Sequence, residues 1–118
     1  MNRVRCLALA LGAIVLSPAP AQAVGFGDAA MAKFTKEDHA LSKAAMKEAL
    51  DSAPDGQAVK WSNPATKAAG SVTPLKTTTE NGLSCRLTQF DNEAKGQKGR
   101  LRYKLCKLAD GSWKVPAK

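Results

Sequence analysis

The chain has 118 residues and carries 18 Lys plus Arg against 10 Asp plus Glu, a formal net charge of +8. This length fits one small domain. Cys85 and Cys106 lie far apart and His39 is the only histidine, so the spacing excludes a Cys-x-x-Cys redox pair and a metal cluster.

The N-terminal segment has the order of a secretory signal peptide. Arg3 and Arg5 precede an apolar stretch, Cys6 to Leu16, and small residues end at Ala23. The stretch is about 11 residues long, shorter than the roughly 20 of a transmembrane helix. We predict export from a bacterial cytoplasm, cleavage after Ala23 and a mature chain without a transmembrane segment. Lipid anchoring is not expected, because Cys6 stands before the apolar stretch.

Residues 24–34 contain two glycines and small side chains without a clear period. Such a segment is typical of a mobile terminus. We therefore divide the chain into a cleaved signal peptide at 1–23, a flexible lead at 24–34 and one domain at 35–118.

A helix is predicted at the start of this domain. Thr35 and Asp38 form a variant of the capping box, and strong helix formers follow to about Ser52. Pro54 and Gly56 end the helix. Its apolar stripe is predicted to contain Leu41, Ala45, Met46, Ala49 and Leu50.

After the helix, short segments with β-branched and aromatic residues alternate with turn dipeptides. Asn81-Gly82 and Asp110-Gly111 predict two-residue hairpin turns with positive φ at both positions. The segment from Asp91 to Gly99 is interpreted as a longer, flexible and basic hairpin tip. The fold class is therefore α+β, with one N-terminal amphipathic helix packed on a small antiparallel meander of four to five strands. The expected strands cover 58–61, 71–79, 83–90, 100–108 and 112–115.

The mature chain retains two cysteines, Cys85 and Cys106, and an even number in an exported chain predicts a disulfide. Closing a loop of about 20 residues contributes roughly 3 kcal/mol in the chain-entropy model. If the two cysteines face each other, one face of the sheet collects Phe90, Leu101, Tyr103 and Leu105, and the other collects Leu83, Leu87, Leu108 and the disulfide. The helix can cover only one face, and the alternation of side chains does not say which.

Positive charge is concentrated at the C-terminal end. From Lys95 onward there are eight basic residues and one acidic residue, a net charge of +7. This segment is either a solvated face or a contact for an anionic partner. Export and the absence of a nucleic-acid motif argue against nucleic acid, which leaves lipopolysaccharide, phospholipid head groups or an acidic envelope protein. The candidate residues are Lys95, Lys98, Arg100 and Arg102.

Trp61, Asn63 and Trp113 form a second candidate. The two indole rings either make a small binding surface beside Asn63 or fill the core. His39 is interpreted as a solvated helix residue, because no nucleophile accompanies it. We expect no catalytic, cofactor or metal site and no enzymatic activity.

Several short motifs occur in a recognisable order, and together they resemble the C-terminal domain of the rickettsial seventeen-kilodalton surface-antigen family over roughly residues 41–115. That family consists of envelope or outer-membrane surface proteins without an established enzymatic activity. Many members carry a lipobox cysteine and a glycine-zipper segment ahead of this domain, and this chain has neither, which favours a soluble periplasmic form. The matching motifs are Ala49-Leu50, Gly56, Trp61-Ser62-Asn63-Pro64, Gly70, Val72, Pro74, Gly82, Cys85-Arg86, Cys106 and Asp110-Gly111-Ser112-Trp113.

The resemblance and the charge together predict a non-catalytic cell-envelope protein that contacts anionic envelope components from the periplasm or at the outer membrane. The alternative is a periplasmic inhibitor or binding partner of a specific envelope protein such as a muramidase.

Overall fold

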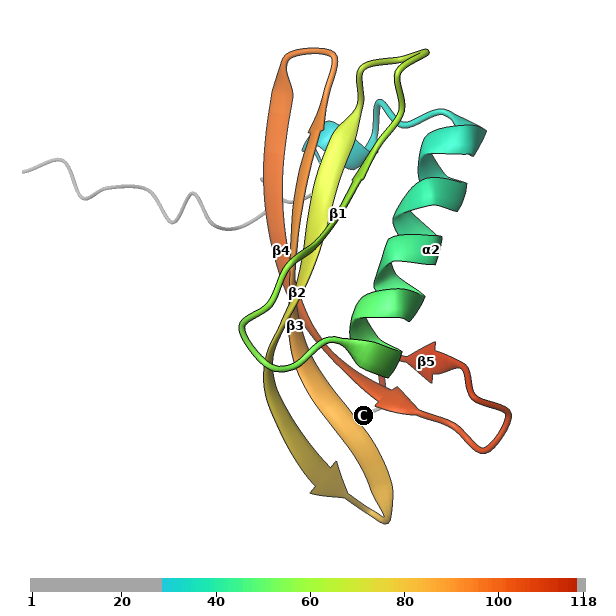
Figure 1. Ribbon diagram of the computed structural model, residues 1–118, viewed down its shortest axis with the longest axis vertical. Helices are drawn as coiled ribbons and strands as arrows, with labels where there is room; N and C mark the ends of the chain where they lie inside the picture. Colours follow the sequence, from blue (N-terminus) through green and yellow to red (C-terminus); the bar gives the residue numbers. More distant parts are fainter. Residues whose placement is uncertain (1–28, 117–118) are drawn as a thin grey trace, which may run out of the picture.

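The computed structural model describes residues 29–116. The predicted signal peptide and residues 24–28 of the expected lead lie outside the described residues. One long helix, α2 (Lys36–Ser52), precedes five strands that form an antiparallel meander in the order β1-β2-β3-β4-β5 (Figure 1). The predicted α+β class is confirmed. The strands are β1 (Val59–Ser62), β2 (Ala69–Glu80), β3 (Leu83–Ala94), β4 (Gln97–Lys107) and β5 (Trp113–Lys114).

Helix α2 begins with the predicted capping box. Thr35 accepts a hydrogen bond from the Asp38 amide, and the Asp38 carboxylate accepts one from the Thr35 amide. The helix ends at Ser52, because the backbone of Ala53 is extended and Pro54 follows.

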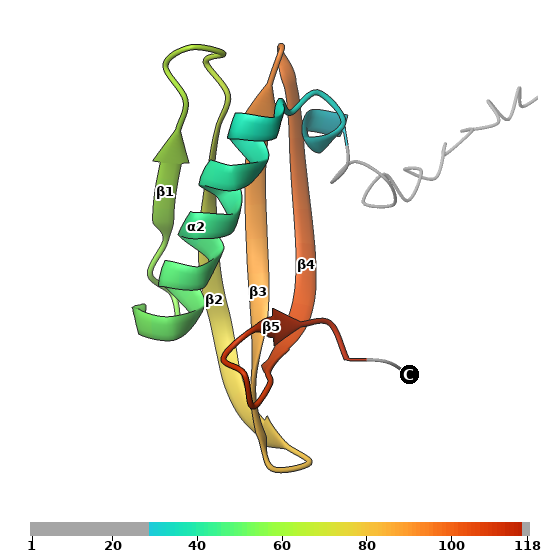
Figure 2. The ribbon, with the colours of Figure 1, turned by 90° about the vertical axis from the view of Figure 1, so that its right-hand side faces the viewer.

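The helix lies across one face of the sheet and contacts β1 and β2 (Figures 1 and 2). This covered face carries Val72, Phe90 and Leu105, which join the buried helix residues in one core. Small side chains at Ala45 and Ala49 let the helix approach closely. The prediction that Leu41 belongs to the buried stripe is wrong. Asp38 is the residue of the first turns that faces the sheet and is buried, and Leu41 lies at the margin of the covered face with 37% of its surface exposed.

The turn Asn81-Gly82 has positive φ at both residues, as predicted. Lys95 and Gly96 form the same kind of turn, with φ of 51° and 77°. The β3–β4 ladder therefore continues to Ala94 and Gln97, and the prediction of a long flexible tip at 91–99 is wrong. Lys95 adopts the left-handed conformation because a tight turn of this type keeps the ladder in register.

The prediction of positive φ at both residues of Asp110-Gly111 is also wrong. Gly111 alone has it, and hydrogen bonds join the Leu108 amide to the Ser112 carbonyl and the Gly111 amide to the Leu108 carbonyl. This pattern is a three-residue loop in which glycine follows an ordinary turn. The Asp110 side chain stabilises it by accepting hydrogen bonds from the amide and hydroxyl of Ser112.

The last residues of the expected lead pack on the domain. Ala30 is fully buried within a short helical turn, and the ring of Phe34 meets that of Trp61 edge to face at 5.2 Å. No helix within residues 29–116 combines the length and apolar character that crossing a membrane requires.

Candidate functional site

The disulfide forms between Cys85 and Cys106, which face each other across β3 and β4. The predicted register holds along the pair, with Thr88 opposite Tyr103 and Phe90 opposite Leu101. The pairing of β3 with β4 has no register shift from Cys85 to Ala94. Side chains therefore alternate between the two faces of the sheet along the whole of β4.

Four cations alternate along β4 and point to the open face of the sheet, the face that α2 does not cover. We call Lys98, Arg100, Arg102 and Lys104 the basic column. Leu101 and Leu105, at the intervening positions, face the helix side and pack with the core. All four basic residues are exposed, and the side chain of Arg100 is 63% exposed. Lys95 lies in the turn that precedes the column.

Acidic residues compensate part of this charge. Arg100 forms an ion pair with Asp91 at 2.7 Å, and Lys104 forms one with Glu80 at 2.6 Å. The hydrogen bond from Lys104 lowers the pKa of Glu80, with a further contribution from Thr78. Arg102 donates to the neutral side chain of Gln89.

Lys98 has a different environment. It stands opposite Glu93 in the ladder and lines a hollow of about 320 Å³ on the open face. Lys60, Ser71 and Asp91 also line this hollow. Lys98 and Arg102 are thus the members of the column that form no ion pair within 4 Å among the described residues.

Trp61 and Trp113 are not brought together. They lie on β1 and β5, the two opposite edges of the sheet, and each is 8% exposed. Trp113 donates from its indole nitrogen to Asp51 of the helix at 2.9 Å. Hydrogen bonds from Lys47 and Trp113 lower the pKa of Asp51 well below its usual range. Both rings therefore fill the core in this structure.

Asn63 is also buried, and it connects the β1–β2 loop to the start of the helix. Its amide donates to Asp38 at 2.7 Å, and Thr66 donates to the same carboxylate oxygen at 2.7 Å. Burial alone would raise the pKa of Asp38, but the hydrogen bonds from the Thr35 amide, Thr66 and Asn63 outweigh it and lower the pKa to about 2. Asp38 is therefore an ionised, fully hydrogen-bonded anchor.

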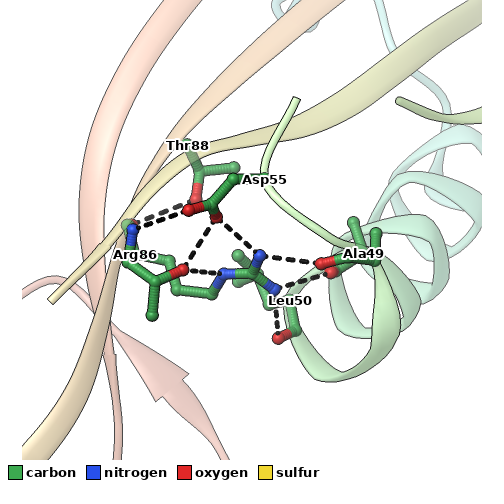
Figure 3. A network of polar contacts seen from close by, with 7 residues as sticks. Ala49, Leu50, Asp55, Arg86 and Thr88 are labelled. Carbon is green, nitrogen blue, oxygen red and sulfur yellow. Dashed lines mark hydrogen bonds and ion pairs between the residues drawn. The ribbon is translucent and has the colours of Figure 1, made fainter. Parts of the chain in front are cut away.

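Arg86 on β3 holds the other end of the helix (Figure 3). Its guanidinium donates to the backbone carbonyls of Ala49, Leu50 and Ala53 at 2.7–3.1 Å. It also donates to Thr77 and forms an ion pair with Asp55 at 2.8 Å. All five N–H donors of the side chain are used.

Sequence reasoning missed this role of Arg86. The last turn of α2 contains no basic residue, so its carbonyl groups need a donor from elsewhere. The missing basic residue in the last turn is a signal that the sequence contains. Which arginine donates to these carbonyl groups depends on how the helix packs against the sheet.

His39 is exposed and packs edge to face on Phe34, with ring centroids 5.3 Å apart. Within residues 29–116 no group of three or more His, Cys, Asp or Glu side chains is arranged to hold a metal ion.

These features define a small, disulfide-linked α+β module in which opposite charges fix the two ends of one helix to the sheet. The family model of the 17 kDa outer membrane surface antigen matches residues 48–114. The chain belongs to this family.

The 17 kDa surface antigens of Rickettsia bellii, Rickettsia conorii and Rickettsia prowazekii are each 32% identical to the chain over 81 residues. The aligned segment covers 68% of this chain and 51% of each relative, so the chain spans about half the length of the curated relatives it matches. No solved structure was found to match the chain.

Proposed function

We propose that this protein is a non-catalytic component of the bacterial cell envelope that binds anionic envelope molecules through the basic column of β4. The family, whose members are named as surface antigens, supports an envelope location. The signal-peptide pattern supports export to the periplasm, where contact with the outer membrane is available.

The observation that carries the proposal is the arrangement of the column. Alternate residues on a strand lie roughly 6.7 Å apart, so the column is a line of like charge about 20 Å long on the face that α2 does not cover. Two of the four cations, Lys98 and Arg102, form no ion pair among the described residues. Phosphate groups of lipopolysaccharide or of anionic phospholipids are suitable ligands for such a line.

Vesicle co-sedimentation tests the proposal. The exported protein is mixed with vesicles of phosphatidylglycerol and phosphatidylcholine, or of phosphatidylcholine alone, at low and at physiological salt. The test variant is Lys98→Gln/Arg102→Gln, which removes the two unpaired charges and leaves both ion pairs of the column intact. The matched control is Lys36→Gln/Lys43→Gln, which removes the same charge from exposed positions of α2.

We expect binding to the anionic vesicles, a loss of binding as salt rises, and an affinity about fivefold lower in the column variant than in the helix control. Equal weakening of both variants would mean that net charge alone drives the association. Absence of binding to the anionic vesicles would contradict the proposal for lipid head groups.

A further inference from the structure

Within residues 29–116, most of β4 has a free edge. On one side β4 pairs with β3 along its whole length, and on the other side β5 pairs only with Cys106 and Lys107. Among the described residues, no strand pairs with residues 97–105 on that side. Figure 2 shows β4 at the margin of the sheet, with β5 beside its C-terminal end.

The register identifies the backbone groups that point to this edge. Cys106 faces Cys85 with the Cα atoms 4.0 Å apart, a short spacing typical of a pair that exchanges no hydrogen bonds. The N–H and C=O of Cys106 therefore point away from β3, toward β5. The ladder has no shift along β4, so the same holds for every second residue. The basic column thus presents its backbone donors and acceptors at the free edge and its side chains on the open face.

The other side of the edge is mainly apolar, with His39 and Lys43 of the helix also bordering it. Leu101 and Tyr103 border a groove of about 270 Å³ between β4 and α2, and Phe90 and Met46 also line it. Tyr103 is 43% exposed there. A strand added to the edge would direct alternate side chains over this groove and the remaining side chains beside the basic column.

A second copy of this chain does not fit the edge. In an antiparallel pair, residues that point their backbone groups toward the partner stand opposite residues that do the same. In a pair of two β4 strands, the residues that point their backbone groups toward the partner are the basic column of each copy. Lysines and arginines would then stand opposite each other, which is unfavourable. Charges on an edge strand prevent self-pairing in this way, and they leave the edge open to a strand of opposite charge.

From these observations we propose that the edge of β4, residues 97–105, accepts an extended acidic segment of a partner protein as a sixth strand. The segment alternates acidic and apolar residues over about five to seven positions. Its acidic side chains meet the basic column, and its apolar side chains cover the groove beside Tyr103. This inference goes beyond the proposed function, because the backbone edge is a site that a lipid head group does not use, although both involve the basic column.

The test uses the full exported protein with its disulfide intact and a nine-residue peptide that alternates Glu and Val, blocked at both ends. In the proposed pairing, the Glu residues stand opposite the basic column and direct their N–H groups toward β4. N-methylation of the Glu residues blocks the new ladder, whereas N-methylation of the Val residues blocks only the outer edge of the peptide. The two modified peptides have the same charge and composition, so each controls the other.

We expect the Val-methylated peptide to bind within about threefold of the parent and the Glu-methylated peptide to bind at least about tenfold more weakly. Hydrogen exchange should slow at the amides of Lys98, Arg100, Arg102 and Lys104 when the parent peptide binds. Equal affinities of the two methylated peptides, or unchanged exchange at these amides, would show that the peptide meets only the charge and would overturn the proposal.

Two other outcomes also overturn it. Failure of every peptide to bind would mean that the charged edge serves only to prevent pairing, and protection of the same amides in a concentration-dependent dimer would identify a second copy as the occupant. Vesicle binding is scored separately, so loss of one activity with retention of the other shows which of the two proposals fails.

Discussion

The two faces of the sheet use charge in opposite ways. On the covered face, Arg86 is 8% exposed and Asp38 is 1% exposed, and each makes at least three hydrogen bonds. On the open face, Arg100 has a single ion pair and a side chain that is 63% exposed. The same residue types therefore hold the fold together on one face and remain available to a ligand on the other.

Desolvation explains the difference. A charge taken out of water is tolerated only when hydrogen bonds replace its hydration, and both buried charges meet this condition. They also match the helix dipole, with Asp38 at the positive N-terminal end of α2 and Arg86 at the negative C-terminal end. Charges on the open face keep their water, so their pairing contributes little to stability.

The largest expected effect is at Arg86. Replacing Arg86 with Met leaves the carbonyl groups at the end of α2 without a donor, and we expect a loss of about 3–5 kcal/mol in urea unfolding. Arg86→Lys should recover only part of this loss, because a lysine cannot donate in five directions. The control, Arg102→Met on the open face, should cost less than about 0.5 kcal/mol. Equal costs for Arg86→Met and Arg102→Met would remove the distinction between the two faces.

The disulfide sharpens the comparison between the two faces. Cys85 lies on the open face of β3, yet it is fully buried. Cys85→Ser should cost about 3 kcal/mol, as expected for a closed loop of this length in a small domain. Thermal melts of the variant and of the reduced wild type should agree. A melting temperature equal to that of the oxidised wild type would show that the bond contributes no stability.

Gly70 tests how tightly the covered face is packed. A Cβ atom there would lie 2.5 Å from the indole nitrogen of Trp61 and 2.6 Å from the backbone carbonyl of Asp91. The carbonyl cannot rotate away, so we expect Gly70→Ala to cost about 1–3 kcal/mol by chemical denaturation. The control is Ser71→Ala, because Ser71 follows Gly70 in the sequence and lies on the open face. It should change stability by less than about 0.5 kcal/mol. If Gly70→Ala left the stability unchanged, the strands would be able to separate locally without cost.

The Asp38 anchor predicts a dependence of stability on pH. The pKa of Asp38 is lowered in the folded protein to about 2 from its ordinary value of 3.8, so its stabilising contribution is complete above about pH 4 and is lost as the pH falls toward 2. Stability measured by urea unfolding from pH 6 to pH 2 should therefore fall less in Asp38→Asn than in the wild type. Parallel curves for the two proteins would show that Asp38 does not titrate with folding.

The smallest effect is expected on the open face. Arg100→Gln breaks the ion pair with Asp91, and we expect a change of less than about 1 kcal/mol that shrinks further in high salt. Denaturation at two salt concentrations measures it. A loss as large as that of Arg86→Met, or one that salt does not reduce, would show that the open face is a structural surface as well.

Local rules in the sequence determined much of this protein. Thr35 and Asp38 predicted the start of the helix, Asn81-Gly82 predicted a tight turn, and the facing cysteines predicted the register of β3 and β4. Each of these depends on residues close in sequence or on one covalent link. The same local reasoning did not predict the turn at Lys95-Gly96, because lysine is not a characteristic residue for positive φ and the ladder imposed it.

Tertiary structure alone decided which face α2 covers and which polar residues it buries. Both faces of β3 and β4 contain apolar residues, so their alternation is compatible with either choice. Packing small helix residues against Val72 and Phe90 made one choice favourable, and it placed Arg86 under the helix end and Asn63 beside Asp38. Residues distant in sequence meet only when the layers pack. The sequence therefore determined the elements and the position of the basic column, and packing determined that Trp61 and Trp113 belong to the core and that the open face of β4 carries the charge.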